Sequence, residues 1–421
     1  MKNKNCNPTK KILNRALLLT LCSLALSSPA VHAQQGSIYV QCPQSTAKHP
    51  TGKGIVCKHI GGGDGMVSMA DDKTTPQYVF GFSEIPTPNP AAGEPAINSA
   101  GYNRWVMDHG LLAANAPAPT IIVDEDDELF LSLTNVGMAM RPDLFDAHTI
   151  HWHGFPNAAS IFDGVPDASV SVNMGATLTY YYNVKEPGTY MYHCHVEAAE
   201  HMQMGMLGNL YVHPKQDKCV FGSAGCPKTK ASDRFAYNDG DGSTRYDVEV
   251  PIQMSGFDPD FHDAEIAVQP LNFAGMRDRF PLLNGRGYPD TVHQGVLSTI
   301  DPLGNKQDSQ PVDALINVTP GQRVLLRVSN LNVTEFNTLA TNGPAMEVVG
   351  LDAKQLVDDE GNHMYYKTNS LTLGGGQSAD VIIDTTGLAP GETYFVYTTN
   401  LDHLANDSEN FGGMMTEIRV M

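Results

Sequence analysis

Basic residues are scarce in this chain. Its 421 residues include 27 Lys and Arg against 46 Asp and Glu, which gives a formal net charge of −19. An acidic protein of this kind repels phosphate backbones and anionic membrane surfaces. Long apolar runs are also missing after residue 33, so no later stretch could span a bilayer. We therefore expect no nucleic-acid partner and no membrane span.

The first 33 residues have the pattern of a cleavable export signal. Ala16 to Ala25 form an apolar core too short to cross a bilayer, and Val31-His32-Ala33 resembles a cleavage site with small residues. A large Leu21 precedes Cys22, which leaves a lipid anchor only as a lesser alternative. Five basic residues precede the apolar core: Lys2, Lys4, Lys10, Lys11 and Arg15. We expect residues 1–33 to be removed and the mature protein to be periplasmic or secreted.

Cysteine is sparse, and its number is odd after the predicted cleavage. The five remaining cysteines are Cys42, Cys57, Cys194, Cys219 and Cys226. In an oxidising compartment cysteines normally pair, which leaves one over. Cys194 is the odd one, because it stands between two histidines. We favour the local pairs Cys42–Cys57 and Cys219–Cys226, and a Cys42–Cys219 arrangement stays open.

Long helical periodicity is missing, and short strand-like runs take its place. Runs rich in Val, Ile, Thr, Tyr and Phe alternate with clusters of Gly, Pro, Asn and Asp, as in an all-β protein of sandwich type. The runs are 120–123, 128–133, 177–184, 189–192, 323–328, 346–349, 379–383 and 392–397.

The chain divides into four regions after the signal. Residues 34–74 contain Gly61-Gly62-Gly63 and few apolar runs, which predicts an irregular N-terminal extension. Residues 75–214 form a first sandwich, the polar residues 215–244 a linker, and residues 245–421 a second sandwich. A weak internal repeat supports two copies of one fold, because Ile121–Asn135 matches Ile316–Asn330 in its strand, turn and strand.

Histidine is plentiful in two short segments of the first sandwich. The first is His148-Thr149-Ile150-His151-Trp152-His153-Gly154, and the second is His193-Cys194-His195 followed by His201 and Met206. On a strand, residues two apart point to the same face. Each His-x-His pair therefore presents both imidazoles to one side, and Cys194 points to the other side.

The thiol side carries a complete set of ligands for a blue copper site. His148 lies three residues before His151, an odd offset, so it can face Cys194. Two His, one Cys thiolate and a weak axial Met are the ligands of such a site. The set is His148, Cys194, His201 and Met206. Met202 and Met204 are expected to be core packing.

The opposite face carries histidines for a second copper site. These are His151, His153, His193 and His195. Electrons that reach Cys194 would have a short covalent route to its neighbours His193 and His195. Unrelated buried histidines fit the interlocking spacing poorly, and structural zinc prefers several closely grouped Cys or Cys/His ligands.

Residues 75–215 resemble the copper-bearing cupredoxin domain of the multicopper oxidases. The motifs are His-x-x-His-x-His-Gly and His-Cys-His with a later His-x4-Met. The resemblance implies two cupredoxin-like Greek-key β-sandwich domains, copper as the cofactor, and a reducing substrate and dioxygen as partners. It assigns His148, Cys194, His201 and Met206 to the type 1 copper. It assigns the other four histidines to a type 2/type 3 cluster. A blue site in the first domain is similar to the two-domain oxidases, which implies a homotrimer.

The chain departs from the family pattern in two places. Five residues, Val196 to Glu200, separate His195 from His201, where the family usually has three. More seriously, the cluster needs eight histidines and the first domain supplies four. The second domain has Asn330–Gly343 and Tyr397–Asn400 where its motifs should be, and it resembles the copper-free middle domain of three-domain oxidases. His403 and Met414-Met415 resemble remnants of the second motif. Either a partner chain completes the cluster, or fewer coppers bind.

The two histidine segments are compatible with three functions. The favoured one is an exported oxidase that takes electrons at the type 1 copper and passes them through Cys194 to a copper site that reduces dioxygen. The alternative is a non-catalytic electron carrier or copper-tolerance protein. A nitrite-reductase-like trimer is disfavoured because that family lacks a His at the position of His195. The electron donor stays open among phenols, metal ions and redox proteins.

Overall fold

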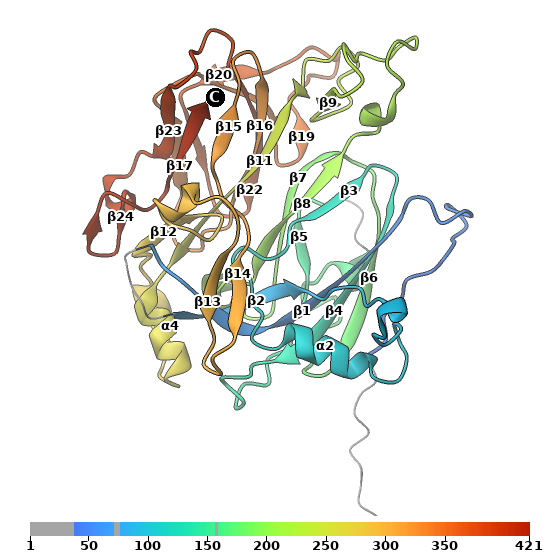
Figure 1. Cartoon of the computed structure of the whole chain (residues 1–421), viewed down its shortest axis with the longest axis vertical. Coiled ribbons are helices and arrows are strands. Elements are labelled where there is room, and N and C mark those ends of the chain that lie inside the picture. The colour runs from blue at the N-terminus through green and yellow to red at the C-terminus, as the bar shows by residue number, and fades with distance from the viewer. Residues whose placement is uncertain (1–37, 71–75, 156–158) are drawn as a thin grey trace, which may run out of the picture. The chain divides into compact units, whose positions relative to one another are not determined.

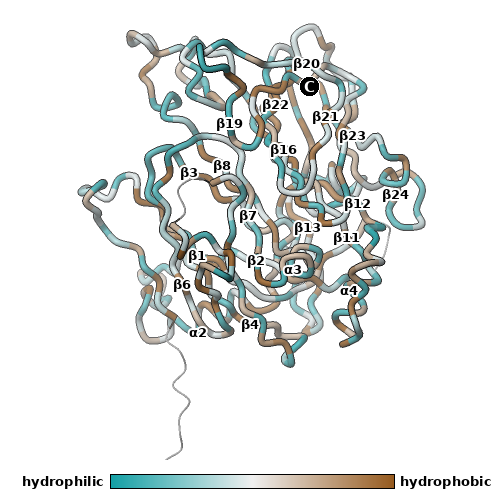
Figure 2. The backbone as a smooth tube through the Cα atoms, turned by 180° about the vertical axis from the view of Figure 1, so that it is seen from behind, coloured by the Kyte–Doolittle hydropathy of each residue, from teal (hydrophilic) through white to brown (hydrophobic). Residues whose placement is uncertain are grey.

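A computed structural model describes residues 38–70, 76–155 and 159–421. The predicted export signal lies outside these residues. Two groups of strands form two β-sandwiches (Figure 1), which confirms the all-β fold class. We call the two sheets formed by strands β1 to β8 the first sandwich, and the two largest sheets formed by strands between β11 and β26 the second. Hydrophobic stretches fall along the strands, and the peripheral loops are largely hydrophilic (Figure 2).

The first sandwich packs one four-stranded sheet, ordered β2-β1-β4-β6, against another ordered β3-β8-β7-β5. The alternating Leu129, Leu131 and Leu133 of β4 are fully buried, as expected of an inner face. The strands are β1 (Ile55–Val67), β2 (Gln77–Glu84), β3 (Ile121–Asp124), β4 (Glu128–Gly137), β5 (His151–His153), β6 (Thr177–Asn183), β7 (Gly188–His193) and β8 (Leu207–His213).

The second sandwich has a sheet ordered β12-β11-β16-β22-β18-β19, with β20 beside β18, and a sheet ordered β15-β26-β23-β17-β21. Its strands are β11 (Val248–Phe257), β12 (Phe280–Leu283), β15 (Ile316–Val318), β16 (Arg323–Asn330), β17 (Asn337–Thr341), β18 (Met346–Leu351), β19 (Lys354–Gln355), β20 (Tyr366–Thr368), β21 (Ser370–Leu373), β22 (Gln377–Asp384), β23 (Thr393–Thr398) and β26 (Met415–Val420).

Small elements decorate the two sandwiches. Three two-stranded ribbons are β9 (Arg234–Phe235) with β10 (Arg245–Tyr246), β13 (Leu297–Ile300) with β14 (Lys306–Gln310), and β24 (Ala405–Asn406) with β25 (Glu409–Asn410). The described α-helices are short: α2 (Tyr102–Gly110), α3 (Ala198–Met204) and α4 (Pro259–Ile266). None of the helices in the described part of the chain has the length and apolar character needed to cross a membrane.

The predicted internal repeat is present in the topology. In the first sandwich β1 pairs in parallel with β4, and β3 with β8; in the second, β11 pairs in parallel with β16, and β15 with β26. The remaining neighbours are antiparallel in both copies. The predicted strand runs agree with β3, β4, β6, β7, β16, β18, β22 and β23 to within a few residues.

The segment 34–74 differs from the irregular extension that the sequence predicted. Ile55–Val67 forms β1, the longest described strand, between β2 and β4. The glycines in this segment are typical of a loop, but here they allow neighbouring residues to pack closely against the strand. A Cβ on Gly62 would lie 2.9 Å from the His148 ring, and one on Gly65 would lie 2.9 Å from the Ala114 nitrogen. Glycine inside a strand often marks such a close approach.

The favoured disulfide pairing is present in the structure. Cys42 is bonded to Cys57 and Cys219 to Cys226, and Cys194 is a buried free thiol. The first bond ties the segment before β1 to β1 itself. The second lies in the predicted linker 215–244, which also contains β9 and so is partly ordered. The domain boundaries themselves stay predictions.

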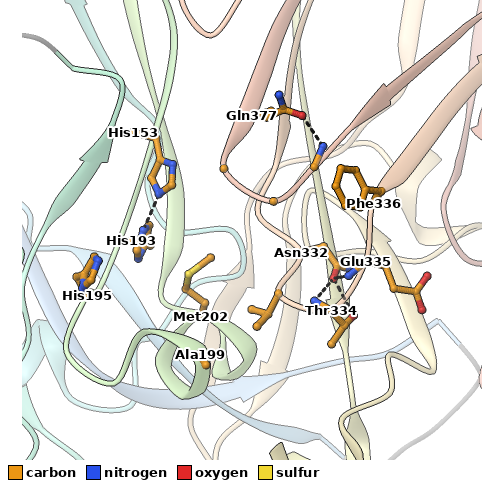
Figure 3. Close-up of a pocket in the computed structure, with 14 residues that line it drawn as sticks. His153, His193, His195, Ala199, Met202, Asn332, Thr334, Glu335, Phe336 and Gln377 are labelled. Atoms are coloured by element: carbon orange, nitrogen blue, oxygen red, sulfur yellow. Dashed lines mark hydrogen bonds between the residues drawn. The ribbon is translucent and has the colours of Figure 1, made fainter. Parts of the chain in front are cut away.

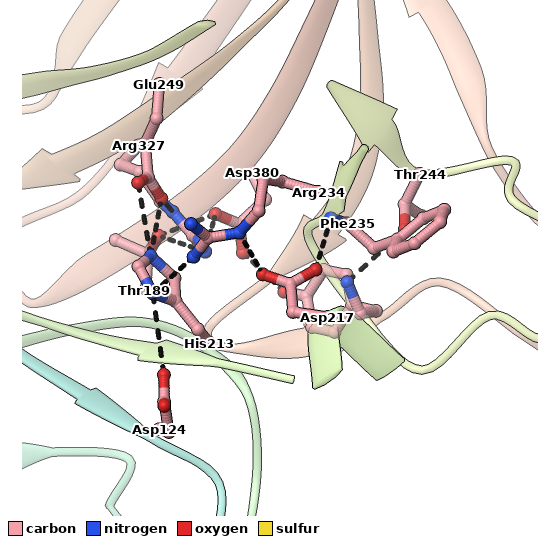
Figure 4. A network of polar contacts seen from close by, with 11 residues as sticks. Asp124, Thr189, His213, Asp217, Arg234, Phe235, Thr244, Glu249, Arg327 and Asp380 are labelled. Carbon is pink, nitrogen blue, oxygen red and sulfur yellow. Dashed lines mark hydrogen bonds and ion pairs between the residues drawn. The ribbon is translucent and has the colours of Figure 1, made fainter. Parts of the chain in front are cut away.

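A buried ion-pair network joins the two sandwiches. Arg327 of β16 is fully buried and lies 2.7 Å from Glu249 and 3.2 Å from Asp380 (Figure 4). From the first sandwich, Thr189 donates to Asp380 at 2.5 Å, and the His213 ring lies 3.1 Å from Glu249. The second sandwich is therefore bonded to β7, which runs into His193-Cys194-His195, and to β8, which begins just after Met206.

Candidate metal centre

Two neighbouring strands present the histidine segments. In the antiparallel pair β5 and β7, His151 lies opposite His193 and His153 lies opposite Met191. Trp152 is buried in the core, whereas His151 and His153 are only partly buried on the other face. The alternation predicted from His-x-His is thus present in β5. Cys194 and His195 follow directly after β7 ends.

His148, Cys194 and His201 converge inside the first sandwich. Each is fully buried, and one donor atom from each lies within 4.8 Å of the other two. The Sγ of Cys194 is 3.1 Å from Nδ1 of His201 and 4.0 Å from Nδ1 of His148. The Thr149 amide donates to the same sulfur at 3.4 Å. This spacing suits one ion bound to two nitrogens and a thiolate.

Met206 lies beside this triad. It is fully buried in the same core cluster as Cys194, and the Cys194 amide donates to the Met206 carbonyl at 3.2 Å. Met204 is also fully buried in that cluster. The backbone pairing therefore holds the predicted axial residue next to the thiol strand.

The triad has a chemical reason to hold a metal. Burial opposes ionisation of Cys194, but His201 and His148 outweigh it and hold the pKa of the thiol well below its usual value. A thiolate is the form that binds copper. The Nδ1 atoms of His148 and His201 both face the sulfur, so two imidazole nitrogens and a thiolate can serve one ion, and copper fits this donor set.

The second group of histidines lies on the opposite side of β7. Donor atoms of His151, His153 and His193 come within 4.8 Å of one another, and Nε2 of His153 is 2.9 Å from Nε2 of His193. The His195 ring centroid is 5.0 Å from that of His151. The structure therefore brings all four predicted residues together, although His195 stands at the edge of the group.

Backbone carbonyls orient two of these rings. Nδ1 of His151 donates to the Asp163 carbonyl and Nδ1 of His193 to the Cys194 carbonyl, both at 2.7 Å. This fixes the tautomer in which Nε2 is the free ligand atom. Burial, only partly offset by its bond to Cys194, lowers the pKa of His193 to about 3. Burial also lowers the pKa of His153. Neutral imidazoles are the form that binds metal.

A cavity of about 730 Å³ opens in front of these histidines. His153, His193 and His195 line one side, and Met202 of α3 lies at the side of the cavity (Figure 3). The second sandwich of the same chain lines the other side, with Asn332 to Phe336 and Gly374 to Gln377. The histidine group therefore faces its own second sandwich across the cavity.

The second sandwich offers no equivalent ligands to this cavity. By strand order, β17 and β23 correspond to β5 and β7. Neither strand carries a histidine, and Leu339 of β17 and Val396 of β23 pack into the core of the second sandwich. His403 is the residue that resembles a remnant of the second copper motif. It is buried, and its Nε2 lies 3.1 Å from Glu335, a cavity-lining residue.

A group of acidic residues lies beside the triad, and the sequence alone did not predict it. Carboxylates of Asp146, Glu197 and Glu200 gather with His201 within 4.8 Å of one another. Burial, reinforced by the nearby Glu265, raises the pKa of Glu200 to about 7. The sequence did hint at this acidic group, because two of the five residues in the lengthened loop Val196 to Glu200 are glutamates. Asp146 could not have been assigned to it, since it lies some fifty residues earlier in the chain.

Gly62 of β1 tests the geometry of the triad. In Gly62→Ala the new Cβ would press on Cδ2 of His148, with Leu133 and Phe82 at 3.4 Å behind it. We expect His148 to shift, and the copper affinity of the triad to fall by about 10- to 100-fold, as for other displaced supports of metal ligands. The measurement is a copper titration followed by visible absorption.

Gly65→Ala is the matched control on the same strand. The new Cβ would clash with Ala114 and not with His148. The substitution therefore disturbs the packing of β1 without contacting the triad. It should lower thermal stability and keep the copper affinity. Equal copper affinity in Gly62→Ala and the unaltered protein would contradict the placement of His148.

Comparisons with known proteins relate the sequence to one family. Two sequence profiles, both described as multicopper oxidase, match residues 103–217 and 277–415. L-ascorbate oxidase of Cucurbita pepo var. melopepo is 25% identical over 291 residues, which cover 66% of this chain and 45% of that protein. Laccase-1 of Emericella nidulans is 35% identical over 107 residues, 24% of this chain and 15% of that protein. The chain thus spans less than half the length of these curated relatives.

Solved structures share the fold. The blue copper oxidase from Nitrosomonas europaea superposes with a TM-score of 0.59 at 20% identity, covering 87% of this chain and 86% of that one. The copper nitrite reductase from the same organism gives a TM-score of 0.54 at 16% identity, covering 87% and 94%. Both similarities concern the arrangement of the two sandwiches.

Proposed function

The chain belongs to the multicopper oxidase family, whose cofactor is copper, and on that premise we propose that it is a copper-dependent oxidase. It takes single electrons from a reducing substrate at His148, Cys194, His201 and Met206. It passes them through Cys194 to the group of His151, His153, His193 and His195, where dioxygen is reduced. One observation carries the proposal: both ligand groups share the segment 193–195, with the thiol on one side and the flanking imidazoles on the other.

The residues of the chain have distinct parts in this activity. Copper bound to them would supply one-electron chemistry at the thiolate side and dioxygen chemistry at the histidine side. Cys194 provides the covalent connection through its own backbone to His193 and His195. The carbonyls of Asp163 and Cys194 hold two imidazoles with Nε2 free. Burial excludes water from the thiolate, because Cys194, His148 and His201 are all fully buried.

Export and assembly belong to the same proposal. The two disulfide bonds favour an oxidising compartment, in keeping with cleavage of residues 1–33 and a periplasmic or secreted protein. Four cluster histidines are missing from the second sandwich at the positions equivalent to β5 and β7. A homotrimer in which a neighbouring chain contributes to the cluster would account for this shortage. The organisation into a copper-binding domain at 75–214 and a ligand-free domain at 245–421 is likewise proposed.

The deciding experiment is the copper content per chain of the copper-reconstituted mature protein, together with dioxygen uptake and the molar mass in solution. The oxidase should bind more than one copper per chain and consume dioxygen with a donor such as hydroquinone. One copper per chain, a blue colour and no dioxygen uptake would overturn the proposal in favour of an electron carrier. A trimeric mass would support completion of the cluster between chains, and a monomeric mass would overturn that part.

A further inference from the structure

We propose that the second sandwich, which lacks ligands for the histidine group, positions that group instead. The backbone carbonyl of Gly376 holds the ring of His153 so that its Nε2 atom is free to face a metal ion. The proposal rests on the proposed function, because it concerns copper binding by the same histidines. It goes beyond that function by giving the ligand-free half of the chain a direct part in the metal site.

Gly376 reaches the histidine group from the other side of the cavity. It lies in the turn between β21 and β22 and lines the cavity together with His153. A Cβ on Gly376 would lie 2.6 Å from Cε1 and 2.7 Å from Nδ1 of His153. The φ of Gly376 is 88°, a left-handed conformation that glycine adopts without a steric cost. Glycine at this position therefore allows the backbone to approach the imidazole ring closely.

The ring of His153 forms a hydrogen bond with the backbone of Gly376. The amide of Gly376 is not the partner, because it already donates to the Asn330 carbonyl at 2.8 Å. The carbonyl of Gly376 is therefore the acceptor, and the donor is Nδ1, the ring nitrogen that lies nearer to Gly376. A neutral imidazole has a single N–H group, so Nε2 keeps its lone pair for a metal.

This bond completes a pattern among three closely grouped histidines. Nδ1 of His151 donates to the Asp163 carbonyl, and Nδ1 of His193 donates to the Cys194 carbonyl. Both of these acceptors belong to the first sandwich, whereas the acceptor for His153 belongs to the second. A hydrogen bond at the outer nitrogen of a ligating histidine fixes its tautomer and ring orientation. The group thus has all three rings oriented only when the second sandwich is in place.

The contact between two of the rings fits a shared ion. Nε2 of His153 is 2.9 Å from Nε2 of His193 (Figure 3). Since both Nδ1 atoms donate to carbonyls, each of these Nε2 atoms carries a lone pair, and the two lone pairs repel each other at this distance. Metal–nitrogen bonds of about 2.0–2.1 Å would let one ion bind both atoms at roughly a right angle. An ion bound in this way removes the repulsion.

The turn that carries Gly376 is fixed on both sandwiches. Its amide is bonded to Asn330 of β16, and the next residue, Gln377, is paired with the same asparagine. The hydroxyl of Ser378 donates to the Thr189 carbonyl of β7 at 2.7 Å. The turn is therefore tied to the strand that runs into the second histidine segment, and its carbonyl has a defined position relative to the rings.

The first test replaces Gly376 by alanine. The new Cβ would press on the ring of His153 and displace it from the carbonyl. We expect copper on the histidine side to bind about 10- to 100-fold more weakly, as at other sites that lose an orienting partner. The blue copper should stay, because Cys194 points to the other side of its strand. The measurement is copper per chain in buffers of increasing chelator strength, with the blue absorption counting the thiolate copper separately.

Gly391→Ala is the matched control. Gly391 belongs to the same sandwich and has the same φ of 88°, but a Cβ there would meet no atom within 4 Å. The substitution imposes the same backbone strain without touching His153, so the copper content should equal that of the unaltered protein. Full copper content in Gly376→Ala would overturn the proposal. An equal loss of copper in both variants would overturn it too, because strain alone would then explain the effect.

A double variant tests whether Gly376 acts through His153. His153→Ala removes the ring and should itself weaken copper binding on the histidine side. Adding Gly376→Ala to His153→Ala should change the remaining affinity by less than about twofold, because the ring that the new Cβ would displace is gone. Losses that simply add up in the double variant would overturn a positioning role through His153.

Dioxygen uptake distinguishes this proposal from the proposed oxidase function. Histidine-side copper that depends on Gly376, in a protein that consumes no dioxygen with hydroquinone, would overturn the oxidase function and leave the positioning role. Dioxygen uptake together with unchanged copper content in Gly376→Ala would overturn the positioning role alone. An unaltered protein that binds only the blue copper would overturn both.

Discussion

Replacing Cys194 by serine is expected to abolish the blue absorption and to reduce dioxygen uptake to background. Cys194 is the one free thiol among the described residues, and its sulfur has His201 and His148 as its neighbours. A serine hydroxyl is far less acidic and does not supply a thiolate. Since a change outside the ligands already costs about 10- to 100-fold at metal sites, loss of this ligand should lower turnover by more than 100-fold.

The copper count shows whether this loss is local. Cys194→Ser should bind about one copper fewer per chain, because the four histidines on the other face keep their own contacts. Met204→Leu is a matched control, since Met204 is as buried as Met206 in the same cluster but is not a predicted ligand. It should retain colour and turnover. A blue Cys194→Ser protein would show that the thiolate assignment is wrong.

The parts of the site that the sequence predicted are those in which local geometry decides. A His-x-His pair on a strand places both rings on one face whatever surrounds it, and β5 shows this arrangement. The correspondence of β17 and β23 to β5 and β7 follows from the repeat in the same way. Both predictions use only the two-residue period of a strand and the order of the strands along the chain, and both can be read from the sequence.

The missed parts depend on contacts between distant segments. The sequence predicts an irregular segment where β1 lies, because the glycines there lack side chains. Only the positions of His148 and Ala114 show why glycine is required. Asp146 joins Glu197 and Glu200 only in the folded protein. The same holds for Arg327, whose partners Glu249 and Asp380 come from two other strands.

Replacing Arg327 by methionine is expected to destabilise the protein by about 3–5 kcal/mol. Arg327 and Asp380 are both fully buried, and Thr189 of the first sandwich also bonds to Asp380. Without the guanidinium, a carboxylate would remain buried with no counter-charge. The measurement is urea unfolding followed by circular dichroism. Arg323→Met on the same strand breaks a more exposed pair with Glu347 and should cost about 1 kcal/mol or less.

A double variant separates the charge from the packing. Arg327→Met with Asp380→Asn removes the unpaired charge at position 380 and keeps one oxygen, which can accept from either Thr189 or Tyr237, since these two bond different oxygens of Asp380. It should be more stable than the sum of the two single changes predicts, by about 1–3 kcal/mol. Strict additivity would show that Arg327 and Asp380 do not act as a pair.

The same network predicts how stability depends on pH. Burial opposes the ionisation of Glu249, but Arg327 and His213 outweigh it and lower the pKa of Glu249 from 4.5 to about 2. A lowered carboxylate pKa gives stability that is complete above pH 4.5 and is lost as the pH falls towards 2. The loss should amount to about 3 kcal/mol in the unaltered protein and be much smaller in Arg327→Met. Other carboxylates titrate in the same window, so the difference between the two proteins is what counts. Parallel curves from pH 5 to 2 would mean that Arg327 does not hold Glu249 ionised.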